Sequence, residues 1–334
     1  MSTVYMLTNL EFVGPERSTY TDGSWAFDRL TFVYRDVQCA LHHVPDYGDI
    51  IKELSETHGA AITATLRLKH DQPLDVQWCD NFANAVCELL SFATKNTVHW
   101  VSREILGIEA QPVYCRGSLF GRARDFRSGW SIISDFVHVD HIRRPELKLF
   151  LSAVIESYVD RLKGKLETAL LWINEAGHEN FVDLSFICLF IGIEKLRGQV
   201  LPKSSTSYLC DDWQELLDNA LALDILAVVE KRLGSLSQDQ AKLLISKIRS
   251  VNSPPTIVLL EELCASLGVL GLDKDIGLLR NKLFHAGSYG NFEFSKVVEL
   301  RKNLSHVVDV CVLKVLGYDG YYRHEATAWR AVKL

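Results

Sequence analysis

The chain lacks the paired cysteines, long apolar runs and charge excess that would assign it to a protein class at once. Its 8 cysteines are scattered and form no CxxC pair, so neither a zinc site nor a redox motif is indicated. The longest apolar run, FICLFIGI, falls far short of the roughly 20 residues that cross a bilayer. The net charge of -6 argues against a protein that coats nucleic acid by bulk charge.

The first residues, MSTVYMLTNLEFVG, lack the basic region, apolar stretch and small-residue cleavage site of a secretory signal. Several cysteines, such as Cys188, stand in apolar runs, where a free thiol behaves as a small core residue. We therefore expect a cytoplasmic protein with no membrane partner and no cofactor.

The first part of the chain mixes strand and helix patterns. A helical spacing of apolar residues covers residues 75–94. Around it lie pieces rich in β-forming residues, at 30–42, 60–70 and 96–107. The sequence predicts an α+β N-terminal domain over residues 1–140, with one or two helices laid on a sheet.

After Pro145 the pattern changes to the helical period of about 3.6 residues. The segments that show it are 146–173, 181–199, 211–233, 237–250 and 294–317. Residues 141–334 are therefore predicted to form an all-α helical bundle. We place the linker near residues 134–146, where the strand pattern stops and Pro145 can begin a helix.

One helix of the predicted bundle differs from the others, because residues 184–193 are apolar all round. Such a helix is expected in the middle of a bundle. Glu194 follows this run directly, and a carboxylate beside a buried helix needs a partner.

The segment RNKLFH, residues 280–285, belongs to a helix that is predicted from about residue 275. An apolar stripe on this helix faces the bundle and consists of Ile276, Leu279, Leu283 and Ala286. Gly287 is expected to end the helix, which places His285 in the last turn.

Three polar residues of this segment form a candidate catalytic site. Asn281 and His285 are four residues apart and project from one face, and the long side chain of Arg280 can reach the same place. RNA cleavage without a metal needs a base for the ribose 2'-hydroxyl, an acid for the leaving 5'-oxygen and cationic groups for the phosphate. Histidine suits the first two roles, arginine clamps phosphate, and asparagine can orient either residue.

This motif, Arg, Asn, three residues and His on the penultimate helix of a C-terminal bundle, resembles the HEPN superfamily, whose pattern is Arg, four to six residues, His. The following Ala286 and Gly287, and the buried helix that ends in Glu194, resemble more narrowly the ApeA-like HEPN proteins of prokaryotic anti-phage defence. Those proteins carry a β-rich domain before the bundle. The resemblance covers residues 145–317 in pattern and 278–287 in letters.

The resemblance implies a metal-independent endoribonuclease that acts as a homodimer, in which two copies of the motif face each other in a composite site. Arg280 would bind the scissile phosphate, His285 would be the general acid or base, and Asn281 would position them. Glu194 would hold Arg280 or His285. The protein would be an anti-phage or toxin-like effector whose N-terminal domain senses a phage-derived or protein trigger or selects RNA.

The alternative is a catalytically inactive HEPN-type bundle that binds a nucleotide or a protein partner, since a fold does not by itself confer activity.

A second candidate RNA site is the stretch CRGSLFGRARDFRSGW, in which Arg116, Arg122, Arg124 and Arg127 alternate with aromatic residues. Arginine and aromatic side chains together suit single-stranded RNA. The other reading is a surface strand whose aromatic residues belong to the core, and the sequence leaves both open.

The remaining reactive residue types favour ordinary structural roles. His138 and His141 lack a third metal ligand and are expected on the surface, while His42 and His43 should point to opposite faces of a strand. Cysteines on apolar helix faces, such as Cys87, are expected in the core. The aromatic residues of the C-terminal tail either pack on the body or contact a partner.

Overall fold

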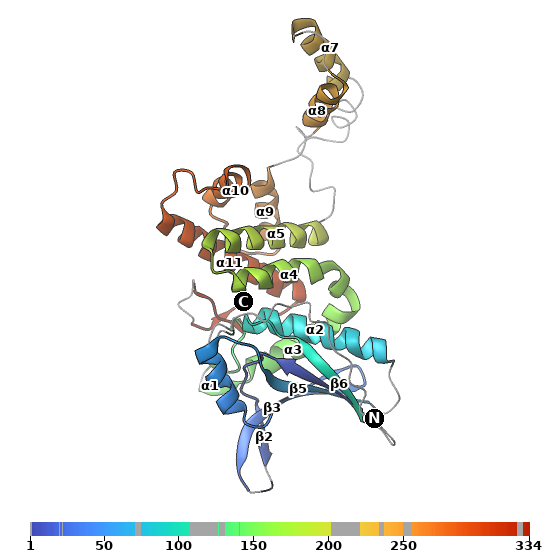
Figure 1. The fold of residues 1–334 in the computed structure, drawn as a ribbon, viewed down its shortest axis with the longest axis vertical. Helices are drawn as coiled ribbons and strands as arrows, with labels where there is room; N and C mark the ends of the chain where they lie inside the picture. The colour runs from blue at the N-terminus through green and yellow to red at the C-terminus, as the bar shows by residue number, and fades with distance from the viewer. Residues whose placement is uncertain are drawn as a thin grey trace.

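The computed structural model describes residues 2–19, 21, 23–70, 75–106, 126, 131–139, 141–201, 221–233, 237–249, 255–325 and 330–334. Figure 1 shows a curved sheet at one end of the molecule and a stack of helices at the other. The prediction of a mixed sheet region followed by a helical region is confirmed at this level.

The N-terminal region is built on a six-stranded sheet with the order β2-β3-β4-β5-β1-β6, in which all neighbours are antiparallel. The predicted piece at 30–42 folds as a hairpin, and its turn contains Arg35 with a φ of 49°. The strands are β1 (Ser2–Thr8), β2 (Glu16–Thr19), β3 (Trp25–Tyr34), β4 (Val37–His43), β5 (Ile62–Lys69) and β6 (Trp100–Leu106).

Two helices accompany this sheet, α1 (Tyr47–Thr57) and α2 (Val76–Thr94). Asp75 begins α2, and its side chain accepts a hydrogen bond from the Trp78 backbone N–H at 2.9 Å, as helix N-caps do. The ring of Tyr34 lies 5.0 Å from that of Phe82, so α2 covers the apolar face of the sheet. The predicted helix at 75–94 is confirmed.

The strand pattern does not stop in the segment predicted as the linker. Residues 137–144 form a small hairpin of β7 (Val137–Val139) and β8 (Ile142–Arg144), with His141 at a φ of 66° in the turn. Pro145 does precede a helix, as predicted, and α3 begins at Glu146.

The helical region surrounds α5, whose side chains Phe186, Phe190 and Ile193 are buried. It packs against α4, α9, α10 and α11, so the predicted central helix is confirmed (Figure 1). No described helix is long and apolar enough to cross a membrane. The helices are α3 (Glu146–Ser157), α4 (Lys163–His178), α5 (Val182–Val200), α7 (Leu221–Leu233), α8 (Gln238–Arg249), α9 (Thr256–Ser266), α10 (Asp275–Ala286) and α11 (Phe294–Leu316), with a π-helical turn (Tyr158–Leu162) joining α3 to α4.

The C-terminal tail corrects the expectation of an all-α second half. It forms a two-stranded ribbon of β9 (Tyr321–Tyr322) and β10 (Val332–Lys333). The Tyr318 hydroxyl and the Tyr321 backbone N–H both donate to Glu146 Oε1, at 2.6 and 2.8 Å. The described part of the tail therefore packs on the body.

The sheet region and the helical region share one apolar core, which runs from Tyr5 in the sheet to Tyr318 after α11. Polar contacts also join them: the Tyr158 hydroxyl donates to Glu88 of α2 at 2.6 Å. The helices that carry the candidate site are therefore built directly on the sheet region.

Candidate functional site

The helix α10 carries the RNKLFH motif, and its bounds agree with the prediction. Three of the four residues of the predicted stripe are buried, namely Ile276, Leu279 and Leu283, whereas Ala286 is exposed. The helix ends at Gly287, which has a φ of 60° and donates its N–H to the Leu283 carbonyl at 3.1 Å. This end is the left-handed glycine cap that the sequence predicts.

Four neighbouring side chains fix the position of Arg280. Its guanidinium lies 3.9 Å from a carboxylate oxygen of Glu194 and donates to the Asn281 side-chain oxygen at 3.2 Å. Its Cζ stands 5.5 Å from the ring centre of Phe190 and 4.7 Å from that of Phe284, within the range of cation–π contacts. Arg280 is thus oriented by α5 and by its own helix.

Glu194 comes from α5, which the sequence marked as the central helix. Burial raises the pKa of the Glu194 carboxyl, while the positive charge of Arg280 acts to lower it. Burial is the larger effect, so the pKa of Glu194 is raised overall; the ion pair offsets part of this effect and holds the arginine in return. The structure brings Arg280, Asn281 and Glu194 together.

His285 follows Asn281 by four residues on the same helix but, among the described contacts, is not bonded to these three residues. It is exposed in the last turn of α10. In the part of the chain that the structure describes, no hydrogen bond or ion pair joins its ring to Arg280, Asn281 or Glu194. The imidazole is consequently available to a molecule that docks on this face.

A cavity of about 370 Å³ opens beside Arg280. Its described lining combines two cationic side chains, two polar ones and an apolar wall, which are Lys274 and Arg280, Thr256 and Asn281, and Phe190, Pro255, Ile257, Gly277 and Leu278. Such a mixture can take an aromatic base together with a phosphate. Lys274 directly precedes α10 and Thr256 begins α9, and neither was predicted as a site residue because their approach to Arg280 depends on how these helices pack.

The arginines proposed for RNA binding, Arg116, Arg122, Arg124 and Arg127, lie outside the described residues. From the same stretch the structure describes Phe126, which is buried, and its carbonyl lies 3.3 Å from Nδ1 of His58. This aromatic residue belongs to the core.

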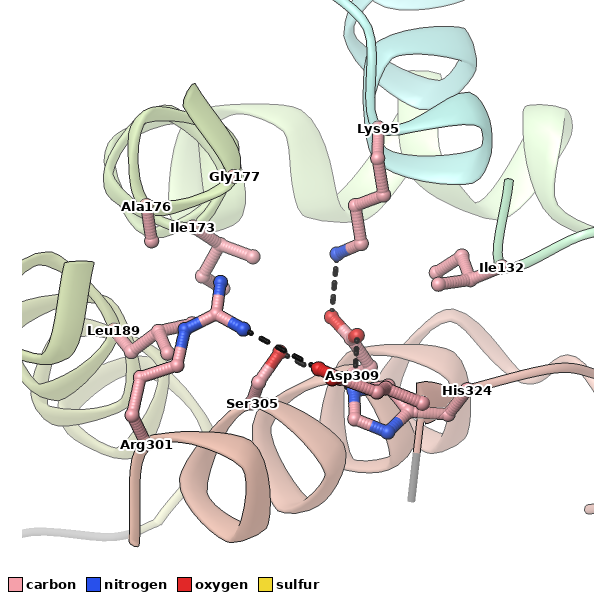
Figure 2. Close-up of a pocket in the computed structure, with 11 residues that line it drawn as sticks. Lys95, Ile132, Ile173, Ala176, Gly177, Leu189, Arg301, Ser305, Asp309 and His324 are labelled. Atoms are coloured by element: carbon pink, nitrogen blue, oxygen red, sulfur yellow. Dashed lines mark hydrogen bonds and ion pairs between the residues drawn. The ribbon is translucent and has the colours of Figure 1, made fainter. Parts of the chain in front are cut away.

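A second polar cluster lies where α2, α11 and the tail meet (Figure 2). Figure 2 shows Lys95 pointing at Asp309, and their Nζ and Oδ1 atoms are 2.7 Å apart. His324 approaches the other carboxylate oxygen at 3.7 Å, and its Nε2 lies 3.3 Å from the Ser305 hydroxyl. The sequence contains a signal for this cluster: Asp309 lies within the apolar run VVDVCV, and a buried carboxylate needs a partner.

This cluster contains Ser, His and Asp, but it does not have the geometry of a catalytic triad. In a triad one ring nitrogen faces the serine and the other faces the aspartate. Here the same atom, Nε2 of His324, faces both Ser305 and Asp309. The cavity measures about 40 Å³, which is room for water rather than for a substrate. The cluster therefore joins elements of the fold.

The other candidates occupy structural positions. Cys87 and Cys264 are buried as predicted, and His138 and His141 are exposed. His43 stacks on Tyr47 with ring centres 3.5 Å apart. Within the described ranges no group of three or more His, Cys, Asp or Glu side chains is arranged to hold a metal ion.

Comparison with known protein families finds a match for the N-terminal part of the chain. Residues 2–100 are similar to the family described as the YopA central domain, and this span covers β1 to β5, α1 and α2. No curated protein and no solved structure matches the chain. The similarity thus concerns the sheet region and does not extend to α10.

Proposed function

We propose that this protein is a metal-independent endoribonuclease of the HEPN type, in the ApeA-like branch. The observation that supports it is the arrangement on α10, where Glu194 and two aromatic rings hold Arg280 beside a cavity while His285 stands free in the last turn. A fixed cation and an unrestrained imidazole are the groups that transfer of an RNA phosphate requires.

The reaction assigns one task to each side chain. A histidine takes the proton of the ribose 2'-hydroxyl, the oxygen attacks phosphorus, and the bond to the 5'-oxygen breaks. A second histidine, protonated, gives its proton to that 5'-oxygen. Arg280 binds the phosphate oxygens, and Asn281 and Glu194 keep its guanidinium in place. The products are a 2',3'-cyclic phosphate and a free 5'-hydroxyl.

Two histidines in one site require two chains, because each α10 supplies one. The exposed surface around α10 favours a second copy: Leu278 is 58% exposed and Phe284 is 41% exposed, both next to the polar residues of the motif. Large apolar side chains in such positions are typical of interfaces. We propose a homodimer whose two copies of α10 face each other.

In the cell this enzyme would act as an anti-phage or toxin-like effector in the cytoplasm. The sheet region would respond to a phage-derived or protein trigger or select the RNA. The RNA-contacting arginines predicted at 116–127 remain part of this proposal.

End-labelled RNA incubated with the protein in EDTA tests the proposal. The wild type is expected to leave a 2',3'-cyclic phosphate or its 3'-phosphate product, and DNA, which lacks the 2'-hydroxyl, stays intact. His285→Ala should lower cleavage at least about 100-fold, as loss of a general acid or base does. His138→Ala is the matched control, since this exposed histidine lies on β7. Full cleavage by His285→Ala, or cleavage that depends on added magnesium, would contradict the assignment.

The second candidate function is nucleotide binding without cleavage. The cavity beside Arg280 favours it, because its lining combines the cations Lys274 and Arg280 with the aromatic ring of Phe190. Calorimetry with a nucleoside monophosphate separates the two: an inactive module binds it and leaves RNA uncut in every condition.

A further inference from the structure

The two faces of the N-terminal sheet differ in what covers them. On β3 the buried residues Leu30, Phe32 and Tyr34 alternate with residues that point to the opposite side. The helix α2 packs against the apolar side, where Phe82 contacts Tyr34. The opposite side of β3, β4 and β5, which we call the open face, carries side chains that are exposed or half-buried.

Positive charge gathers on the open face. A hollow of about 310 Å³ there is lined by three cations, Arg29, Arg67 and Lys69, and by His42, whose pKa is lowered by burial, and its described lining contains no acidic residue. The strand register explains the grouping, because Arg29 pairs with His42 on β4, while Arg67 and Lys69 are two residues apart on β5. Residues spaced by two on a strand lie on the same face, roughly 6.6 Å apart.

The cations of the open face are only partly neutralised. Arg29 donates a hydrogen bond to the Glu16 carboxylate at 2.9 Å, and Lys148 donates to the same carboxylate at 2.8 Å. One carboxylate therefore faces two cations, and these three side chains together keep a net positive charge. Arg67 and Lys69 have no hydrogen bond or ion pair with an acidic side chain among the described residues. Like charges in such proximity repel each other unless an anion binds between them, and the chain as a whole carries a net charge of -6.

Exposed aromatic rings continue the open face toward the start of β3. Trp25 is 53% exposed and Phe27 is 37% exposed, and both alternate in step with Arg29. The guanidinium carbon of Arg17 lies 4.6 Å from the ring centre of Trp25, and that of Arg143 lies 5.5 Å from the ring centre of Phe27. Rings paired with guanidinium groups offer stacking surfaces for unpaired bases.

We propose that the open face binds single-stranded RNA, with bases on Trp25 and Phe27 and phosphates on Arg67 and Lys69. Phosphate contacts and base stacking on one surface are the chemistry by which proteins hold unpaired nucleic acid. The identification of the ligand as RNA, rather than another polyanion, rests on the proposed function. The charge and the exposed rings of the open face are observed independently of that function.

The sheet and α10 lie well apart, with α2, α4 and α5 between them (Figure 1). A short RNA on the sheet therefore leaves the α10 site of the same chain empty. RNA bound to the open face would be a flank of the substrate rather than the nucleotides that are cut.

Binding of a fluorescein-labelled, 20-nucleotide single-stranded RNA, followed by anisotropy, tests the inference. The protein is the full chain with His285→Ala, so that turnover does not interfere. Adding Arg67→Gln with Lys69→Gln should weaken binding about tenfold and reduce the slope of log K against log salt by about 1.4, since two phosphate contacts are lost. The matched control is Lys52→Gln with Lys165→Gln, which removes the same charge from exposed positions on α1 and α4.

Trp25→Ala should weaken binding about fivefold or more through lost stacking, with little change in the salt slope. The inference is overturned if the Arg67 and Lys69 variant binds as tightly as the control, if duplex RNA binds as well as the single strand, or if poly-glutamate competes as well as RNA. The last result would indicate an acidic protein partner instead. Loss of cleavage with intact binding would count against the proposed function alone.

Discussion

The ion pair between Lys95 and Asp309 offers a direct test of how the two regions are joined. Lys95 caps α2 of the sheet region, and Asp309 lies on α11 of the helical region. Asp309 is fully buried, and the Lys95 side chain is 14% exposed. Removing the lysine, as in Lys95→Met, leaves a carboxylate in the core without its main countercharge.

His324 cannot replace the missing lysine. Burial, the largest effect on its ring, lowers the pKa of His324 to about 4 even though Asp309 acts in the opposite direction. At pH 7 the imidazole is therefore neutral. Breaking a buried pair by removing one partner typically costs about 3–5 kcal/mol, so Lys95→Met should lower the free energy of unfolding by about 3 kcal/mol or more.

Urea unfolding followed by circular dichroism measures this loss. Asp309→Asn removes the stranded charge, so the double variant should be less destabilised than the sum of the two single variants. Lys333→Met is the control, because its pair with Asp319 is exposed and should contribute less than about 1 kcal/mol. A loss under about 1 kcal/mol for Lys95→Met, or strict additivity in the double variant, would refute the argument that the pair is buried and coupled.

Two further predictions concern stability. Burial acts against ionisation of Glu16, but the hydrogen bonds that its carboxylate accepts outweigh burial and lower its pKa to about 2. The ionised carboxylate therefore stabilises the fold at pH values above its unfolded pKa, near 4.5. This stabilisation is lost as the pH falls toward 2. Glu16→Gln should be about 1–2 kcal/mol less stable at pH 7, a figure that allows for solvent screening of this partly exposed group, and should lose less stability between pH 5 and pH 2, measured by urea unfolding at each pH; equal pH profiles would contradict this. A Cβ at Gly320 would collide with Tyr318 and Glu146, so Gly320→Ala should cost about 2 kcal/mol or more in thermal unfolding. Gly164→Ala, with nothing nearby, should be neutral or stabilising, and equal behaviour of the two would show that the tail is not packed as described.

The pattern of neighbouring residues was enough to predict α10, which has one apolar stripe, and α5, which is apolar on all sides. The bounds of α10 and the burial of Ile276, Leu279 and Leu283 follow from helical spacing and a glycine cap, which are properties of neighbouring residues. The central position of α5 follows from its lack of a polar side. In each case the information lies within one segment.

Pairing between distant segments was harder to predict. β1 was not predicted, because its position depends on partners in β5 and β6 more than 50 residues away. The hairpin of β7 and β8 has strands of 3 residues each, too short for an alternating pattern. The need of Glu194 for a partner was visible in the sequence, but the choice of Arg280 depends on how α5 packs against α10.

The separation of the open face from α10 limits what each can contribute to catalysis. In the proposed enzyme, contacts made only by the sheet would strengthen binding of the substrate and of the transition state alike. The cations and rings of the sheet would then set which RNA is bound. Lowering the chemical barrier would fall to groups that touch the phosphate, and on the described surface of α10 these would be Arg280, held in place by Glu194, and the exposed His285.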